Sequence, residues 1–136
     1  MRLTLVLLLF CGPALAETVV ATRTIRPQSI LTAADLAVRD GRLPGAFERP
    51  DRLIGQETRV VLYAGRPVLP EDIGPPAVVE RNQVVTLSYR RGGLVIRLEG
   101  RSLARAGVGE VVRVMNLQSR TTVSGRVRAD GTVHVE

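Results

Sequence analysis

The sequence is short of the side chains that most often carry chemistry. It has no lysine and no tryptophan, a single cysteine, Cys11, and a single histidine, His134. One histidine and one cysteine provide neither a disulfide framework nor a recognisable metal site. Gly107 and Gly109 do not form a phosphate loop, because a strand pattern follows them and not a helix start. These absences predict a protein without a catalytic, metal or cofactor site.

Aromatic residues are also scarce, at 3% of the chain, which argues against nucleic acid as a partner. The formal net charge is +6, and every basic residue is an arginine. Sites for single-stranded nucleic acid combine such charges with aromatic rings on which bases stack. Here the arginines alternate with acidic and apolar residues. We therefore expect a solvated basic surface or a patch for an acidic partner.

The most apolar run lies at the N-terminus and has the pattern of a secretory signal. Met1-Arg2 is a basic start, Leu3–Phe10 an apolar core, and Ala14-Leu15-Ala16 a small-residue cleavage site. The run is too short to cross a bilayer, which takes about 20 apolar residues. We expect cleavage after Ala16, which also removes the cysteine and leaves no stable membrane insertion.

The first half of the remaining chain contains an approximate internal repeat. Pro27–Leu36 aligns with Ala64–Ile73: each has a turn, an apolar pair, two spacer residues, and then Asp-Leu or Asp-Ile. Asp35 and Asp72 stand at helix-start positions, where a carboxylate caps free N–H groups, so capping is favoured over a catalytic carboxylate pair. We predict a pseudo-twofold, strand-poor unit over residues 17–76, each copy ending in a short capped turn.

A Gly-Pro-Pro break at 74–76 separates this unit from a second half, residues 77–136, that is rich in strand patterns. A hairpin with a glycine-rich turn is followed by a three-stranded meander, with strands at Val84–Tyr89, Leu94–Leu98, Glu110–Met115, Thr121–Arg128 and Thr132–Val135. Asp130-Gly131 favours a type I′ turn. We predict a small antiparallel β-barrel or sheet of about five strands, since closure removes open edges.

Both halves resemble known families. The paired frame with Leu53-Ile54-Gly55 between its copies resembles an SAF domain, which has the β-clip fold. The most specific C-terminal motifs are Gly109-Glu110-x-x-Arg113-Val114-x-Asn116-x-x-Ser119 and Gly125-x-Val127. Together with the signal, they resemble the flagellar basal-body P-ring formation protein family, in a short form without the extra N-terminal region of longer members. The expected fold is therefore mainly β, with a β-clip-like domain followed by the small barrel or sheet.

The resemblance implies a periplasmic, non-enzymatic assembly factor. Such a chaperone would bind the subunit of the flagellar P ring before it polymerises around the rod. Two other functions stay open on the residues alone. One is a pilus-assembly periplasmic protein that also contains an SAF domain. The other is a glycan- or small-molecule-binding module, which would need a concave site with convergent polar groups.

The C-terminal meander offers candidate residues for binding a partner. Its arginines lie on the face opposite the valines, where they would steer an acidic segment. If the barrel is open, its last strand lies at an edge and can recruit a partner strand; if the barrel is closed, that edge is paired internally. Asn116 and Ser119 close a turn and so shape the surface. The predicted partner-binding residues are Arg113, Asn116, Ser119, Arg126, Arg128 and Val133.

Overall fold

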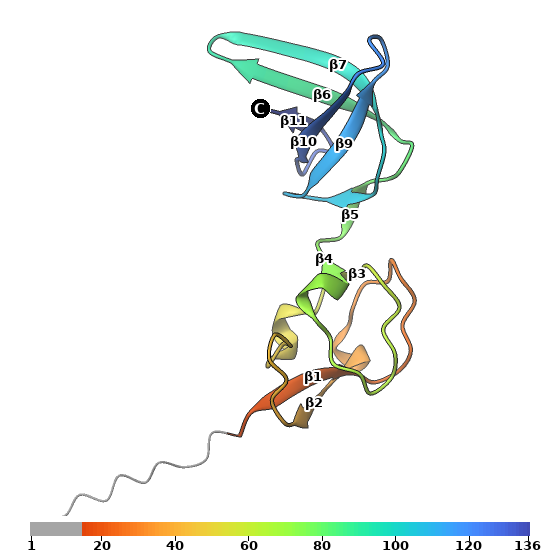
Figure 1. Cartoon of the computed structure of the whole chain (residues 1–136), viewed down its shortest axis with the longest axis vertical. Coiled ribbons are helices and arrows are strands. Elements are labelled where there is room, and N and C mark those ends of the chain that lie inside the picture. The colour runs from red at the N-terminus through yellow and green to blue at the C-terminus, as the bar shows by residue number, and fades with distance from the viewer. Residues whose placement is uncertain (1–14) are drawn as a thin grey trace, which may run out of the picture.

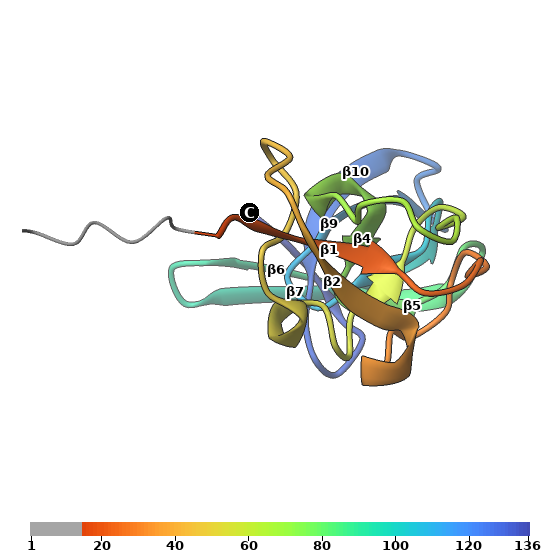
Figure 2. The same ribbon diagram turned by 90° about the horizontal axis from the view of Figure 1, so that it is seen from below.

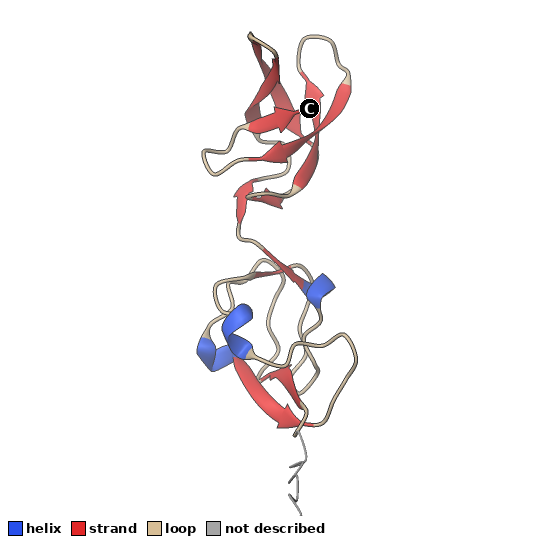
Figure 3. Cartoon of the chain, turned by 90° about the vertical axis from the view of Figure 1, so that its left-hand side faces the viewer, coloured by secondary structure: helices blue, strands red, loops and turns tan. Residues whose placement is uncertain are grey.

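A two-residue link, Pro75-Pro76, separates two packed lobes in the computed structural model of the chain, which describes residues 15–136 (Figure 1). The N-terminal lobe (residues 17–74) holds three short 3₁₀ turns, whereas the C-terminal lobe (residues 77–136) is built from strands (Figure 3). Apart from Leu15 and Ala16, the predicted signal peptide with Cys11 lies outside the described residues. Within those residues, no helix is both long enough and apolar enough to span a bilayer.

Two small antiparallel sheets and three single turns form the N-terminal lobe. In chain order the elements are β1 (Glu17–Ala21), η1 (Ala33–Asp35), β2 (Leu36–Asp40), η2 (Pro50–Arg52), β3 (Glu57–Thr58), η3 (Pro70–Asp72) and β4 (Ile73–Gly74). Strand β1 pairs with β2, and β3 pairs with β4. Most of the lobe is therefore irregular backbone, as the repeat predicts.

Equivalent backbone hydrogen bonds relate the two copies of the repeat. The Leu31 amide donates to the Gln56 carbonyl at 2.9 Å, and the equivalent Val68 amide donates to the Val19 carbonyl at 3.1 Å. In each case an amide of one copy donates to a carbonyl in the segment that precedes the other copy, at equivalent positions. The lobe therefore has an approximate twofold axis. The prediction of a pseudo-twofold unit is confirmed.

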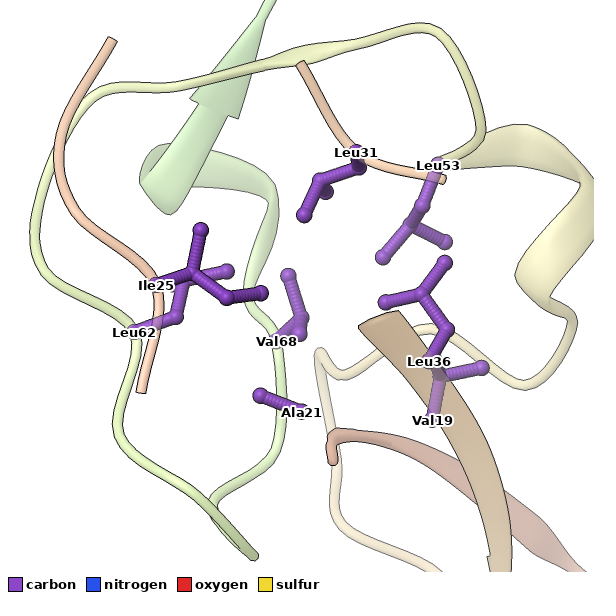
Figure 4. Packing of buried hydrophobic residues seen from close by; sticks show 8 residues of the cluster. All are labelled: Val19, Ala21, Ile25, Leu31, Leu36, Leu53, Leu62 and Val68. Atoms are coloured by element: carbon purple, nitrogen blue, oxygen red, sulfur yellow. The ribbon is translucent and has the colours of Figure 1, made fainter. Parts of the chain in front are cut away.

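The core of the N-terminal lobe lies on this axis. Ile25 and Leu62 exchange both backbone hydrogen bonds, at 2.8 and 3.0 Å, and their side chains lie next to each other (Figure 4). The buried hydrophobic cluster around them consists of Val19, Ala21, Ile25, Leu31, Leu36, Leu53, Leu62 and Val68. Burial of apolar surface on both sides of the axis compensates for the small number of ladder hydrogen bonds.

The repeated aspartates close the two short turns, as the sequence predicts. Asp35 accepts hydrogen bonds from the Thr32 amide at 3.0 Å and the Thr32 hydroxyl at 2.7 Å, and Asp72 accepts one from the Leu69 amide at 2.9 Å. The bonds from Thr32, with a smaller contribution from Arg23, hold the pKa of Asp35 below its usual range. Both carboxylates therefore have a structural use.

Seven strands make up the C-terminal lobe, and five of them close into a barrel. They are β5 (Ala77–Val79), β6 (Val84–Arg91), β7 (Leu94–Ser102), β8 (Ala106–Gly107), β9 (Val111–Asn116), β10 (Thr122–Val127) and β11 (Val133–Val135). The barrel order is β10-β11-β6-β7-β9, while β5 pairs with β8 beneath it. Valine dominates its core. Gly100 has no room for a side chain, because the Leu87 and Val114 side chains occupy that space.

Two details of the predicted barrel are wrong. It is not wholly antiparallel, because β11 lies parallel to β6 and thereby closes the sheet. The Asp130-Gly131 turn is not of type I′, because the Arg128 amide donates to the Thr132 carbonyl across a three-residue loop. Only Gly131 of that loop has a positive φ, at 81°. This is the usual geometry of a type I turn followed by a left-handed residue.

A buried ionic junction connects the two lobes. Glu57 in β3 is only 2% exposed, and its carboxylate accepts bonds from Arg105 Nε at 2.9 Å and Arg105 Nη2 at 3.0 Å. The Ala77 amide, directly after the proline link, donates to the same carboxylate at 3.0 Å. Arg59 Nη2 in turn donates to Glu110 at 2.7 Å and to the Pro75 carbonyl at 3.0 Å. The junction thus joins side chains from both lobes to the backbone of the link.

The environment of Glu57 makes the junction sensitive to acid. Hydrogen bonds from Arg105, and more weakly from the Ala77 amide, hold the pKa of Glu57 below its ordinary value of 4.5, against the opposing effect of burial. A carboxylate with a lowered folded-state pKa stabilises the fold at pH values above its unfolded pKa. That contribution is lost as the pH falls from about 4.5 through the lower folded-state pKa.

We predict that Glu57→Gln lowers the free energy of unfolding by about 3 kcal/mol at pH 7, because it breaks the two-bond ion pair with Arg105 and leaves that partly buried guanidinium only its exposed partner, Glu80. Glu80 is the other partner of Arg105, and the Glu80 side chain is 59% exposed. Glu80→Gln should therefore lower the free energy of unfolding by less than about 1 kcal/mol. Urea unfolding between pH 7 and pH 3 measures both. The difference between wild type and Glu57→Gln should shrink as the pH falls; a gap that stays constant would contradict the assigned charge state.

Candidate partner-binding surface

A row of polar side chains crosses four neighbouring strands on the outer face of the barrel. Arg126 in β10 pairs with His134 in β11, His134 pairs with Ser88 in β6, and Ser88 pairs with Arg97 in β7. Side chains of directly paired residues project from the same face of a sheet. The closure by β11 therefore brings two arginines that are far apart in sequence onto one face.

A pocket of about 520 Å³ lies over part of this row. We call it the outer-face pocket; it is lined by Thr86, Ser88, Arg90, Arg97, Arg128, Asp130, Thr132 and His134. Three of the lining residues are arginines, and only one is an acid. The pocket therefore carries a positive field, which favours carboxylates of an approaching partner.

The single acid of the pocket is held by its own loop. Asp130 Oδ1 accepts bonds from the Thr132 hydroxyl at 2.7 Å and the Thr132 amide at 2.9 Å. These bonds lower the pKa of Asp130, and Arg128 adds a smaller electrostatic contribution. None of the ion pairs among residues 15–136 involves Arg90, Arg97 or Arg128. Their charge is thus available to a ligand.

The three arginines predicted from the sequence all lie on the outer face, but they do not form one cluster. Arg128 lines the outer-face pocket. Arg126 lies beside it and donates to the Gly109 carbonyl at 2.6 Å. Arg113 is exposed on β9, directly across from Ser124. Strand alternation correctly predicts that the three arginines share a face, but only Arg128 lines the outer-face pocket.

Asn116 and Ser119 shape the turn between β9 and β10. Asn116 Oδ1 accepts the Gln118 amide at 2.8 Å and the Ser119 amide at 3.3 Å, and Ser119 Oγ accepts the Thr121 amide at 3.4 Å. The turn also holds Arg120 at a positive φ of 63°. These side chains are therefore used by their own turn, as the sequence analysis expects.

The prediction that Val133 belongs to the partner-binding surface is wrong. Its exposed fraction is 0%, and its strand is paired on both sides, with β10 and with β6. The strand offers no free edge, because its parallel pairing with β6 closes the barrel. Recruitment of a partner strand at β11 is therefore excluded.

Arg97 and His134 were not predicted to lie on one surface. Regular polar alternation at Thr86, Ser88 and Arg90 was the available signal for the outer face. The position of His134 beside Ser88 depends on a parallel pairing that no local turn specifies. Among the described residues, no group of three or more histidine, cysteine or acidic side chains could hold a metal ion.

Comparison with known proteins places this geometry in context. A protein family described as "Chaperone for flagella basal body P-ring formation" matches residues 16–135. The chain is 37% identical over 135 residues to "Flagellar protein FlgA" of Rhizobium meliloti (strain 1021), covering 94% of this chain and 80% of that protein. It is 29% identical over 131 residues to the protein of the same name from Agrobacterium fabrum (strain C58), covering 91% and 81%.

A solved structure supports the same relationship. The crystal structure of Salmonella FlgA in open form superposes with a TM-score of 0.68 at 25% sequence identity. The match covers 88% of this chain but 59% of the Salmonella chain, so this chain spans about three fifths of that relative's length. The mainly β architecture described above agrees with that structure.

Proposed function

The chain belongs to the family of chaperones for flagella basal body P-ring formation, and on that premise we propose that it binds the P-ring subunit itself in the periplasm before the ring assembles. The observation that carries the proposal is the family match across residues 16–135. We further propose that the protein acts by binding alone, without catalysis. Residues 17–76 and 77–136 would act as separate domains, in keeping with their two distinct hydrophobic clusters.

The physical task of such a chaperone is to cover a surface that the ring later buries. An unassembled subunit exposes apolar surface and unpaired strand edges, which make it prone to aggregate. A partner that covers these features reversibly keeps the subunit competent for assembly. The exposed outer face of the barrel, with its surplus of arginine, suits an acidic region of the subunit.

Arginines on this face would act mainly on the rate of encounter. Arg113, Arg126 and Arg128 are exposed, and a field from several like charges steers an oppositely charged partner. Asn116 and Ser119 would contribute by fixing the shape of the turn beside them. We propose this arginine-bearing face as the part of the protein that first meets the ring subunit.

Export is the remaining part of the proposal. Ala14-Leu15-Ala16 after a short apolar run supports cleavage after Ala16 by the secretory pathway. The exported chain should begin at Glu17, which mass spectrometry of the periplasmic fraction measures. A lipid on Cys11, or an uncleaved chain in the inner membrane, would contradict this prediction.

We predict that deleting the gene stops flagellar assembly at the P ring while the rod still forms. Electron microscopy of isolated basal bodies should show rods without the ring, and complementation with the intact gene should restore it. Complete P rings in the deletion strain would contradict the proposed function. The ring subunit should also be less soluble in the deletion strain, because its exposed surfaces are no longer covered.

We predict that Arg113→Glu combined with Arg128→Glu slows association with the purified ring subunit by about tenfold at low salt, and that the effect shrinks as salt rises. The matched control is Arg26→Glu combined with Arg42→Glu, which changes the net charge equally on exposed positions of the N-terminal lobe. Stopped-flow or biolayer interferometry gives the association rates. Equal slowing by both pairs would indicate a general charge effect and not a binding face.

A further inference from the structure

The β6–β7 hairpin extends beyond the barrel as a two-stranded arm. Strand β11 pairs with β6 only as far as Tyr89, and β9 pairs with β7 only from Gly100 onward. Residues 90–98, which we call the arm, therefore have no third strand among the described residues. Two perpendicular views show the arm projecting past the rest of the barrel (Figures 1 and 2). An isolated two-stranded hairpin is only marginally stable in water, so a partner that adds a strand to the arm would stabilise it.

One edge of the arm presents free backbone groups. In an antiparallel pair, successive residues direct their N–H and C=O groups alternately toward the partner strand and away from it. Glu99 uses its outward carbonyl to accept the Leu117 amide at 3.1 Å. By alternation, Val95 and Arg97 direct their backbone groups outward on the same edge. No strand pairs with that edge between 94 and 98 within the described residues.

The two faces of the arm differ in chemistry. Tyr89 pairs with Ile96 and therefore continues the barrel's inward-facing side, which Leu94 also shares. Leu94 is 56% exposed and Ile96 38% exposed, so this face is uncovered and mostly apolar, with Arg91 opposite Leu94 at the tip. The opposite face bears Arg90 and Arg97, both of which line the outer-face pocket. An uncovered apolar face beside a free edge is a site at which another strand gains both hydrogen bonds and burial.

We propose that the free edge of β7, at residues 94–98, binds an extended segment of the ring subunit by strand addition. The inference rests on the proposed function and assigns the part of the surface that holds the subunit. The two faces of the arm predict the side chains of the bound segment. Its apolar residues would lie on the side of Leu94 and Ile96, and would alternate with acidic residues on the side of Arg97. Main-chain hydrogen bonds supply affinity in this mode, and the alternating side chains supply specificity.

Charge argues against a second copy of this chain as the occupant. Two β7 edges paired with each other would bring the Arg97 side chains of the two copies close together, because residues 94–98 are the part of that edge left free by β9. Like charges in direct cross-strand contact are destabilising, and edge charges commonly prevent such self-association. An acidic residue placed opposite Arg97 would be attracted instead, although Glu99 on the same face limits how far the acidic region can extend toward the barrel. The arginines thus select against self-pairing and in favour of an acidic partner.

A proline at Val95 tests the edge with little disturbance to the arm. The outward Val95 amide takes no part in the β6–β7 ladder, so Val95→Pro removes one edge donor and obstructs an incoming strand. Val95→Ala keeps the amide and is the matched control. The mature chain, purified from the periplasm, is measured against the purified ring subunit. Val95→Pro should raise the dissociation constant about tenfold or more, because hydrogen bonds to the added strand are lost. For Val95→Ala the dissociation constant should change by less than about threefold.

Amide hydrogen exchange gives an independent measurement on the unmodified chain. In the free protein the Val95 and Arg97 amides should exchange rapidly, and in the complex they should become protected, because a bound strand accepts their hydrogen bonds. Wild-type affinity of Val95→Pro together with unprotected amides would overturn the edge site while leaving the chaperone function intact. No binding of the ring subunit by the wild-type chain would overturn the function itself. Wild-type dimers abolished by Val95→Pro would assign the edge to self-pairing and overturn the proposal.

Discussion

The buried carboxylate of Glu57 is the contact on which the relation between the two lobes depends. An ionised group with almost no access to water is tolerated only when its oxygens are fully satisfied. Here the bonds come from Arg105 of the barrel and from the Ala77 amide at the end of the link. Gly107 permits this approach, since a side chain there would come within 2.6 Å of the Pro75 carbonyl. The bidentate pair and the Ala77 bond hold the barrel against the N-terminal lobe across the proline link.

Features with local signals could be predicted from the sequence, whereas features that depend on distant pairing could not. The capped turns at Asp35 and Asp72 and the hairpin at Gly92-Gly93 follow from short motifs, and the structure contains all three. Glu57 resembles an ordinary surface acid in sequence, because its main partner is 48 residues away. Likewise, alternation places Arg126 and Arg128 on the outer face, but the position of Val133 depends on a parallel pairing without a connecting turn.

The exclusive use of arginine suits both tasks that the structure sets for its cations. At the junction, a planar guanidinium reaches both oxygens of Glu57, which an ammonium group does less well. On the outer face, the same fork of donors would match the carboxylates of the acidic segment proposed above. One residue type thus serves both the buried ionic junction and the exposed outer face of the barrel.

The parallel seam between β11 and β6 also sets the order in which the protein can complete its fold. The contacts of the N-terminal lobe core lie within the first half of the chain, so that lobe can form before the barrel is complete. The barrel cannot close until Val133–Val135 has joined the sheet, because those residues fill the gap between β10 and β6. Until then β6 and β10 each have an open edge and the valine core lacks one wall. A chain truncated before this strand would therefore hold a folded first lobe attached to an aggregation-prone sheet.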